Sequence, residues 1–412
     1  MKIITTLTVS LLTSQTLAAV NIGLNYPETG PYSVQGLAQK NGAELALAEI
    51  NAVGGILGEP ITLIRQDTAS NKNKSAQNVA DMIDNQQVQM VLGGSSSAVA
   101  IAGGKAAKER DKLYFGTLTY SNATTDEEGH SHMFRECYNA WMGAKVLSHY
   151  LKENFADKKY FYITADYTWG WTTEDSVRSF SSTTDNTKHK RVLTKFPGAT
   201  DEDFVNAILQ AKAEHPDVLV LVLFGSDMAK AVSIATGLGL KNDMAIVVPN
   251  LTLGMAQSAG ADVMEGVIGA LPWSWNVPYM QNNERGIQFV EAFSKRYYSY
   301  PSTSAASAYS ILYQYKDAVE RAGTFETAAV IKALEGHKYS FLKDEQQWRG
   351  FDHQNIQTVY AVRSKSKAAV EADKFQQDYF EIIASMSGNE AAKSHEEWLA
   401  VRQVAGKPNQ LE

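Results

Sequence analysis

The chain has a single cysteine, Cys137, among its 412 residues. One thiol cannot form an internal disulfide, even in an oxidising compartment. Cys137 also lies far from the N-terminus, so we expect no lipid attachment at a cysteine directly after a cleaved leader. The sequence therefore argues against a disulfide-stabilised domain and against a lipoprotein.

An excess of positive charge is also missing. The 38 Lys and Arg residues are outnumbered by 45 Asp and Glu residues, which gives a formal net charge of −7. This balance favours solubility and argues against a nucleic-acid partner. Long apolar runs are absent after residue 19, because the densest one, Val218 to Phe224, has only the length of a strand.

Motifs of catalysis and of cofactor binding are scarce as well. Gly237-Leu238-Gly239 is not followed by the third glycine of a dinucleotide fingerprint, and His130 and His132 have no third clustered ligand for a metal ion. No phosphate loop or Ser/His/Asp arrangement can be placed by motif. We therefore expect no enzyme activity, no cofactor and no metal.

The N-terminus has the pattern of a targeting signal. Lys2 precedes an apolar run from Ile3 to Leu17, which is followed by the small residues Ala18 and Ala19. This pattern predicts a cleavable signal peptide over residues 1–19 and export to the periplasm. The alternative is an ordinary first strand or helix.

After residue 19, short β-rich runs alternate with amphipathic helical patterns, which is typical of parallel sheets wrapped by crossover helices. One helix buries Ala43, Ala46 and Ile50 and ends at Gly54-Gly55. The alternation predicts an α/β fold with two sheets. The predicted strands are Val20–Tyr26, Ile61–Arg65, Val88–Leu92, Leu113–Thr117, Tyr160–Thr164, Val192–Phe196, Val218–Leu223, Ala245–Val248 and Thr358–Val362.

We expect the chain to pass between the two sheets near Arg135–Ala140 and again near Ala270–Trp273. From Glu284 onward the pattern is mainly helical. The predicted division is residues 20–138 plus 272–350 for lobe 1 and residues 139–271 plus 351–412 for lobe 2. The tail, Val370 to Glu412, is predicted to be a helical addition to lobe 2.

Several segments, in order, resemble a known family. They are Thr29-Gly30-Pro31, the helix and turn from Gly42 to Gly58, Gly93 to Ser97, Thr164 to Gly170, and Asp352-His353-Gln354. Together they resemble the type I periplasmic solute-binding proteins of ABC importers, which are similar to the leucine/isoleucine/valine-binding protein. The resemblance implies two Rossmann-like lobes, a hinge of three crossovers, and a ligand held in the cleft that closes between the lobes.

The run Gly93 to Ser97 is the first candidate for ligand contact. Two glycines and the hydroxyls of Ser95, Ser96 and Ser97 stand where a strand ends and a helix begins. Backbone N–H groups, hydroxyls and the helix dipole therefore converge on a point that suits a carboxylate. The alternative is that these serines only cap the helix.

Further candidates come from the loops that follow other strands. Thr119 and Ser121 resemble a second pair of hydroxyls, and Tyr167 and Trp169 resemble an aromatic wall from lobe 2. A polar loop and a core role are the respective alternatives. The remaining candidates are Gln35, Phe224, Asn250 and Trp273; for Trp273 the alternative is interface packing.

Asn250 departs from the family pattern, in which the resemblance implies an acidic residue facing a ligand ammonium. Either the ligand lacks an α-amino group, or another acid such as Glu28, Asp227 or Glu265 serves. Amino acids, aromatic acids and other small carboxylates all remain open as ligands.

The leading hypothesis is a monomeric periplasmic receptor that delivers a small solute to a membrane ABC permease. The second is a receptor that presents its ligand to a membrane sensor protein, and the third is an enzyme, which rests only on the capacity of α/β lobes to host catalysis.

Overall fold

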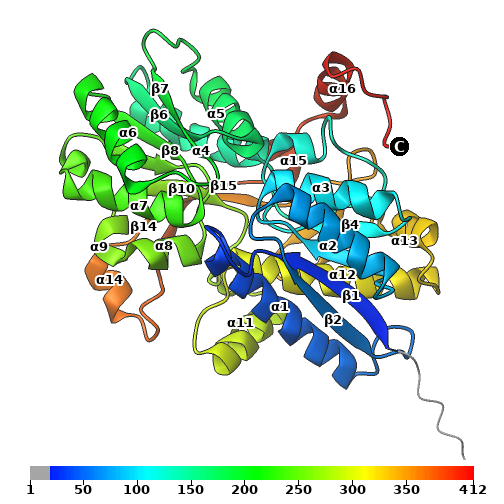
Figure 1. Cartoon of the computed structure of the whole chain (residues 1–412). Coiled ribbons are helices and arrows are strands. Elements are labelled where there is room, and N and C mark those ends of the chain that lie inside the picture. The colour runs from blue at the N-terminus through cyan, green and yellow to red at the C-terminus, as the bar shows by residue number, and fades with distance from the viewer. Residues whose placement is uncertain (1–18) are drawn as a thin grey trace, which may run out of the picture.

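The computed structural model describes residues 19–412, and the predicted signal peptide lies almost wholly outside them. Two sheets lie side by side, each flanked by helices, as Figure 1 shows. This arrangement confirms the predicted α/β fold of two mainly parallel, Rossmann-like lobes. No helix within residues 19–412 is long and apolar enough to cross a membrane.

Lobe 1 is built on a five-stranded sheet with the order β2-β1-β3-β4-β5, in which every neighbouring pair is parallel. Its strands are β1 (Val20–Tyr26), β2 (Ile61–Asp67), β3 (Met90–Gly93), β4 (Leu113–Gly116) and β5 (Met133–Arg135). Its helices are α1 (Ser33–Ala52), α2 (Lys72–Asp84), α3 (Ser97–Lys108), α11 (Glu284–Tyr297), α12 (Thr303–Ala322) and α13 (Thr327–Leu334), and η1 (Asn122–Thr124) is a short 3₁₀ turn.

Close packing of α1 on α12 depends on one glycine. A Cβ atom at Gly42 would lie 2.2 Å from the carbonyl oxygen of Ala305, so only glycine permits this approach. The buried face of α1 includes the predicted Ala43, Ala46 and Ile50, and the helix ends before Gly54 and Gly55, both of which have positive φ.

Lobe 2 is built on a seven-stranded sheet with the order β15-β14-β10-β9-β8-β6-β7. Its strands are β6 (Tyr160–Ala165), β7 (Arg191–Thr194), β8 (Val218–Val222), β9 (Ala245–Val248), β10 (Ile268–Leu271), β14 (Val359–Ser364) and β15 (Phe380–Met386). The accompanying helices are α4 (Ala140–Phe155), α5 (Thr168–Ser181), α6 (Asp201–Glu214), α7 (Gly225–Gly237), α8 (Leu253–Ala259), α9 (Ala261–Met264) and α14 (Lys367–Ala372), with the 3₁₀ turn η2 (Leu240–Asn242).

The interior strand β8 is buried at all five positions of its sequence Val-Leu-Val-Leu-Val. Helices cover both faces of a parallel sheet, so such a strand needs apolar residues on both sides. Two adjacent strands at one side of the sheet, β14 and β15, run antiparallel to their neighbours, and β15 is the edge strand there.

The chain passes between the lobes after β5, after β10 and before β14, at residues 136–139, 272–276 and 357–358. Around these passages lie α10 (Val277–Met280) and a small sheet of β11 (Lys338–Ser340), β12 (Glu345–Trp348) and β13 (Asn355–Ile356). The division by residue number given above stays a prediction.

The tail differs from the helical addition that the sequence predicted. Residues Phe380–Met386 form β15, which pairs with β14 from Ser364↔Phe380 to Val359↔Met386. The two adjacent isoleucines, Ile382 and Ile383, suit a strand that covers the exposed edge of β14. Two helices follow β15, α15 (Gly388–Ala391) and α16 (His395–Val404).

Candidate functional site

The candidate ligand residues follow the carboxyl ends of strands in both lobes. Ser95 to Ser97 follow β3, and Thr119 and Ser121 follow β4. In lobe 2, Trp169 follows β6, Phe224 follows β8, and Asn250 follows β9. The ends of parallel strands are the usual ligand-binding edge of an open α/β sheet.

The two lobes touch across this edge, so the structure has the cleft closed. The Ser226 N–H donates to the Pro31 carbonyl at 3.1 Å, and the hydroxyls of Tyr32 and Tyr167 lie 2.9 Å apart. Farther along, Ser121 Oγ lies 3.2 Å from Thr172 Oγ1, and Asn122 Nδ2 donates to Ser176 Oγ at 3.0 Å. Each of these contacts joins a loop or helix of lobe 1 to lobe 2.

The serine run after β3 is fully buried. Ser95 has a positive φ of 66° and accepts a hydrogen bond from Gln39 Nε2. Ser96 is the N-cap residue of α3, yet its side chain makes no capping hydrogen bond. Ser97 Oγ accepts from the Ser121 N–H at 2.9 Å. Ser97 thus orients the neighbouring loop, whereas the Ser96 hydroxyl is not used as a cap.

The loop after β4 is held from behind by Arg135, which is fully buried on β5. Its guanidinium donates to the carbonyls of Thr119 and Ser121 and to Thr125 Oγ1. Thr119 Oγ1, itself buried, has no hydrogen-bond partner within the described chain. Residues 119–126 are called the ligand loop below.

Seven aromatic side chains meet between the lobes. Phe224 is central to them, with ring centroids 5.2 Å from Tyr32, 5.8 Å from Tyr120 and 5.9 Å from Trp169. Phe196 stacks on Tyr167 at 4.2 Å, and Tyr138 lies 5.1 Å from Tyr120. We call this set the aromatic cluster: Tyr32, Tyr120, Tyr138, Tyr167, Trp169, Phe196 and Phe224.

Several buried polar atoms of the aromatic cluster and of the other candidate residues have no hydrogen-bond partner in residues 19–412. The donors are Tyr120 OH and Trp169 Nε1, and the acceptors are Gln35 Oε1, Gln39 Oε1 and Asn250 Oδ1. Asn250 uses only its Nδ2, which donates to Tyr138 OH at 2.8 Å. Because an unpaired buried polar atom costs roughly 1–3 kcal/mol, a cluster of them is typical of a site that a polar molecule fills.

The aromatic cluster is electrically neutral at ordinary pH. Burial raises the pKa values of the Tyr32, Tyr120 and Tyr138 hydroxyls far above the usual value, so they remain protonated. Asp227 acts through its charge on Tyr32 and Tyr167, and burial raises the pKa of its carboxyl to about 6.

The other two acids considered from the sequence have different surroundings. Glu28 is exposed. Glu265, at the C-terminal end of α9, accepts a hydrogen bond from the Lys367 N–H, so it faces another part of lobe 2.

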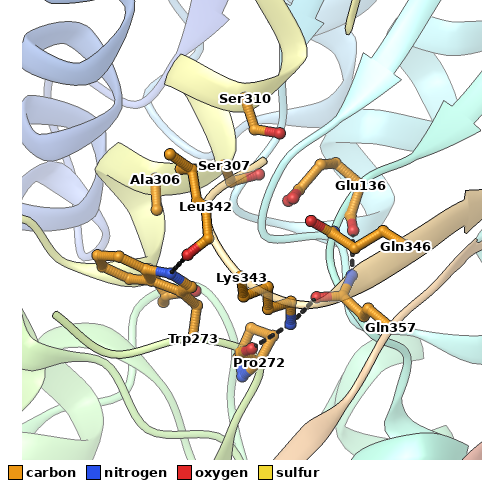
Figure 2. Close-up of a pocket in the computed structure, with 11 residues that line it drawn as sticks. Glu136, Pro272, Trp273, Ala306, Ser307, Ser310, Leu342, Lys343, Gln346 and Gln357 are labelled. Atoms are coloured by element: carbon orange, nitrogen blue, oxygen red, sulfur yellow. Dashed lines mark hydrogen bonds between the residues drawn. The ribbon is translucent and has the colours of Figure 1, made fainter. Parts of the chain in front are cut away.

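Trp273 belongs to a different region, at the second passage between the lobes. Its Nε1 donates to the Leu342 carbonyl at 3.2 Å, and its ring lies 5.9 Å from Phe289. Figure 2 shows it lining a small cavity together with Glu136, Lys343 and Gln357. Interface packing, the alternative considered from the sequence, describes these contacts. We call this region the hinge cavity.

Lys343 connects the passages of the chain around the hinge cavity. Its ammonium donates to the Pro272 carbonyl at 2.7 Å, to Gln357 Oε1 at 2.7 Å and to the Thr358 carbonyl at 2.8 Å. Gln357 Nε2 donates in turn to the Glu136 carbonyl at 2.5 Å (Figure 2). Burial lowers the pKa of Lys343 to about 8, and burial raises the pKa of the Glu136 carboxyl.

Sequence reasoning did not find Tyr32, Tyr120, Tyr138, Phe196 or Gln39. A signal was present for three of them, because Tyr32 directly follows Thr29-Gly30-Pro31, Tyr120 stands between Thr119 and Ser121, and Phe196 follows β7. Gln39 lies one helical turn after Gln35 on α1, so the two side chains share a face. Tyr138 gave no local signal, because it lies in the passage between the lobes.

Comparison with known proteins agrees with this architecture. Residues 19–369 match the family model of a periplasmic binding protein. A Leu/Ile/Val-binding protein homolog of Brucella abortus is 27% identical over 349 residues, which cover 77% of this chain and 81% of that protein.

Two solved structures share the fold. A periplasmic binding protein from Burkholderia mallei superposes with a TM-score of 0.82 at 21% identity, covering 92% of this chain and 97% of that one. A solute-binding protein of an ABC transporter from Rhodopseudomonas palustris, in complex with 3,4-dihydroxybenzoic acid, has a TM-score of 0.75 at 16% identity and covers 90% of this chain and 98% of its own.

The family match spans most of the chain, and the two lobes, the passages between them and the closed cleft have the form that the resemblance implied. The chain belongs to the periplasmic binding protein family.

Proposed function

We propose that the protein is the substrate-binding component of an ABC importer and that it closes its lobes around a small carboxylate-bearing solute. The single observation that supports this most is the group of unpartnered buried polar atoms around the aromatic cluster. They lie between two lobes whose family binds solutes. We infer binding without catalysis, in the periplasm.

The chemistry of the aromatic cluster supports a flat or apolar solute with an acid group. Tyr120 OH and Trp169 Nε1 can donate to a carboxylate, and the Ser96 hydroxyl stands at the start of α3, where the helix dipole favours an anion. The aromatic rings supply apolar contact for the rest of the molecule. Unpaired acceptors at Gln35, Gln39 and Asn250 suit hydroxyl or amino hydrogens on the solute.

Relatives differ in what their names say they bind. The Brucella abortus relative is named for leucine, isoleucine and valine, whereas the Rhodopseudomonas palustris protein was solved with 3,4-dihydroxybenzoic acid. The neutral Asn250 and the seven aromatic side chains favour an aromatic acid for this chain. An α-amino acid would need an acid such as Asp227, whose charge acts on Tyr32 and Tyr167, as the partner of its ammonium.

A surface for the membrane permease is suggested by a groove at the rim of the closed cleft. Val34 and Leu37 of α1 are 47% and 53% exposed and line it with Gly254 and Gln257 of α8. Helix α1 belongs to lobe 1 and α8 to lobe 2, so the groove has this shape only while the lobes are closed. A partner that fits it would distinguish loaded from empty receptor.

A thermal-shift panel of aromatic acids, aliphatic acids and α-amino acids tests the proposal. A true solute raises the free energy of unfolding by RT ln(1 + [L]/Kd), about 2.7 kcal/mol at a hundredfold excess over Kd. Ser96→Ala should lower the affinity for the stabilising acid several-fold. Ser179→Ala, at an exposed position of α5, should leave that affinity unchanged. Absence of any stabilising acid, confirmed by calorimetry, contradicts the proposal.

A further inference from the structure

The last 43 residues, 370–412, lie beyond the part of the chain that matches the family model, which ends at residue 369. They begin within α14 of lobe 2 and include β15, α15 and α16. We call residues 387–404 the tail strap. Figure 1 shows α16 at the upper right, apart from the sheet of lobe 2.

One end of the tail strap is fixed to lobe 2. It begins directly after β15, which is paired with β14 along its length. A Cβ atom at Gly388 would lie 2.3 Å from the Gln357 amide nitrogen, so the backbone here presses against the third passage between the lobes. Lys145 of α4 donates to the Glu390 carbonyl at 2.6 Å.

The other end is fixed to lobe 1, on the ligand loop. Lys393 makes an ion pair with Asp126, and the two side chains are only 6% and 2% exposed. Trp398, fully buried, donates its Nε1 to the Thr125 carbonyl at 2.9 Å. Arg402 donates to the Asp126 carbonyl at 2.7 Å.

The ligand loop is thus held by Arg135 on one side and by the tail strap on the other. Arg135 holds Thr119, Ser121 and Thr125 from the inside, and the tail strap holds Thr125 and Asp126 from the outside. The loop between these anchors presents Tyr120, with its unpartnered hydroxyl, to the aromatic cluster. Displacement of the outer anchor would therefore move groups that face the solute.

We propose that Lys393 and Trp398 are positioning residues for the solute site. They hold the ligand loop in its binding geometry, and the attachment of the tail strap to β15 makes that geometry depend on the arrangement of the two lobes. The tail strap is thus a fourth connection between the lobes, in addition to the three passages of the hinge. This inference rests on the proposed function, because it assigns the ligand loop to the solute.

Hydrogen exchange and affinity in the full chain test the positioning role. Asp126→Asn combined with Lys393→Met removes both charges, so that no unpaired charge stays buried. The double variant still loses the ion pair between the tail strap and the ligand loop. We expect faster amide exchange in residues 119–126 of the solute-free protein and about tenfold weaker binding of the acid identified in the thermal panel. Lys393→Arg alone, which keeps a cation opposite Asp126, should leave exchange and affinity as in the wild type.

Wild-type exchange and wild-type affinity in the double variant would overturn the positioning role. The exchange readout needs no solute. If the wild-type protein binds none of the acids, the proposed function fails by itself, while faster exchange in the double variant still supports the tie to the ligand loop.

A second variant tests the connection between the lobes. Insertion of about six Gly and Ser residues between Met386 and Ser387 leaves β15 and α16 intact but adds slack of roughly 12–15 Å. We expect normal exchange in the ligand loop, a larger radius of gyration of the solute-free protein by small-angle X-ray scattering, and several-fold weaker binding. An unchanged radius together with unchanged affinity would show that the tail strap does not couple the lobes.

Discussion

The aromatic cluster and the hinge cavity both join lobe 1 to lobe 2, but with opposite chemistry. The aromatic cluster is neutral and leaves buried donors and acceptors unpaired, among them Tyr120 OH and Trp169 Nε1. The hinge cavity contains two buried ionisable groups, and its ammonium has three acceptors. In the proposed function, the aromatic cluster opens and closes while the hinge cavity persists, and it is the aromatic cluster that leaves polar atoms unpaired.

In the proposed function, this difference indicates the source of the free energy of closure. Apolar rings that meet across a cleft can separate into water at moderate cost, and a solute that pairs the orphan atoms favours the closed state. Removal of Lys343 from its acceptors would leave a charge without partners, which is far more costly.

The largest effect is expected in the aromatic cluster. Trp169→Ala removes a buried ring and an unpaired donor, and we expect the solute affinity to fall about 100-fold, the size typical of a buried tryptophan at a binding centre. Trp171→Ala is the matched control, since Trp171 lies on the same helix but is 45% exposed. Calorimetry measures the affinity of both variants. Equal affinities would show that the aromatic cluster does not contact the solute.

The buried Lys343 of the hinge cavity should make the free energy of unfolding depend on pH. Burial lowers the pKa of Lys343 to about 8, while an unfolded lysine titrates near 10.4, so the unfolded chain binds more protons between these values. The unfolding free energy of the wild type should therefore rise with pH in this window, by roughly 2 kcal/mol from pH 8 to pH 10, relative to Lys343→Met. Urea titrations measure this difference.

The control for that experiment is Lys338→Met, which removes an exposed lysine from β11. It should follow the wild-type pH dependence. A Lys343→Met variant with the same pH dependence as the wild type would mean that Lys343 keeps an ordinary pKa and that the hinge cavity is not a buried charge site.

Closure itself can be blocked at Gly225, at the start of α7. This residue has φ of 63°, and a Cβ atom there would lie 2.5 Å from the carbonyl oxygen of Pro31 in the opposite lobe. Gly225→Ala should weaken solute binding about tenfold, because the added atom disfavours the closed state.

Gly237→Ala, at the other end of α7, has no atom within 4 Å of the added Cβ and should leave binding unchanged. A Gly225→Ala variant with full affinity, measured by calorimetry, would show that the lobes need not approach as closely as they do here.

The smallest effect concerns the identity of the solute. Burial raises the pKa of Asp227 to about 6, so it gains its charge between pH 5 and pH 7. An acid without an amino group should lose affinity a few-fold over this range because the carboxylates repel, and Asp227→Asn should make the profile flat. Asp201→Asn, at an exposed position, is the control. An affinity that rises with pH would instead indicate an ammonium on the solute.

Much of the fold could be predicted because its signals are local. Alternation of strands and helices, the glycines after α1 and the apolar strand β8 each reflect a few neighbouring residues. β15 was missed because its own sequence does not distinguish it from a polar tail. Its pairing with β14 is what makes it a strand. Short β5 and β10 were missed for the same reason, since pairing with a neighbour is what makes them strands.

The candidate site was predicted in part. Ser95 to Ser97 were found because a strand end and a helix start lie together in the sequence, and their contact with a solute stays a prediction. Tyr138 and Phe196 come from separate elements that meet only when both lobes have folded and closed, so no local pattern could group them. Trp273 is aromatic like the other candidates from the sequence. It follows β10 in the second passage between the lobes, however, and therefore lies at the hinge cavity.

Cys137 lies buried within the first passage between the lobes, and burial raises the pKa of its thiol to about 12. At neutral pH it is a poor nucleophile toward alkylating reagents. A cysteine engineered on the surface would therefore be the one thiol that a maleimide dye modifies, without any need to remove the native residue. A pair of such dyes, one on each lobe, would turn the protein into an optical reporter of its own solute.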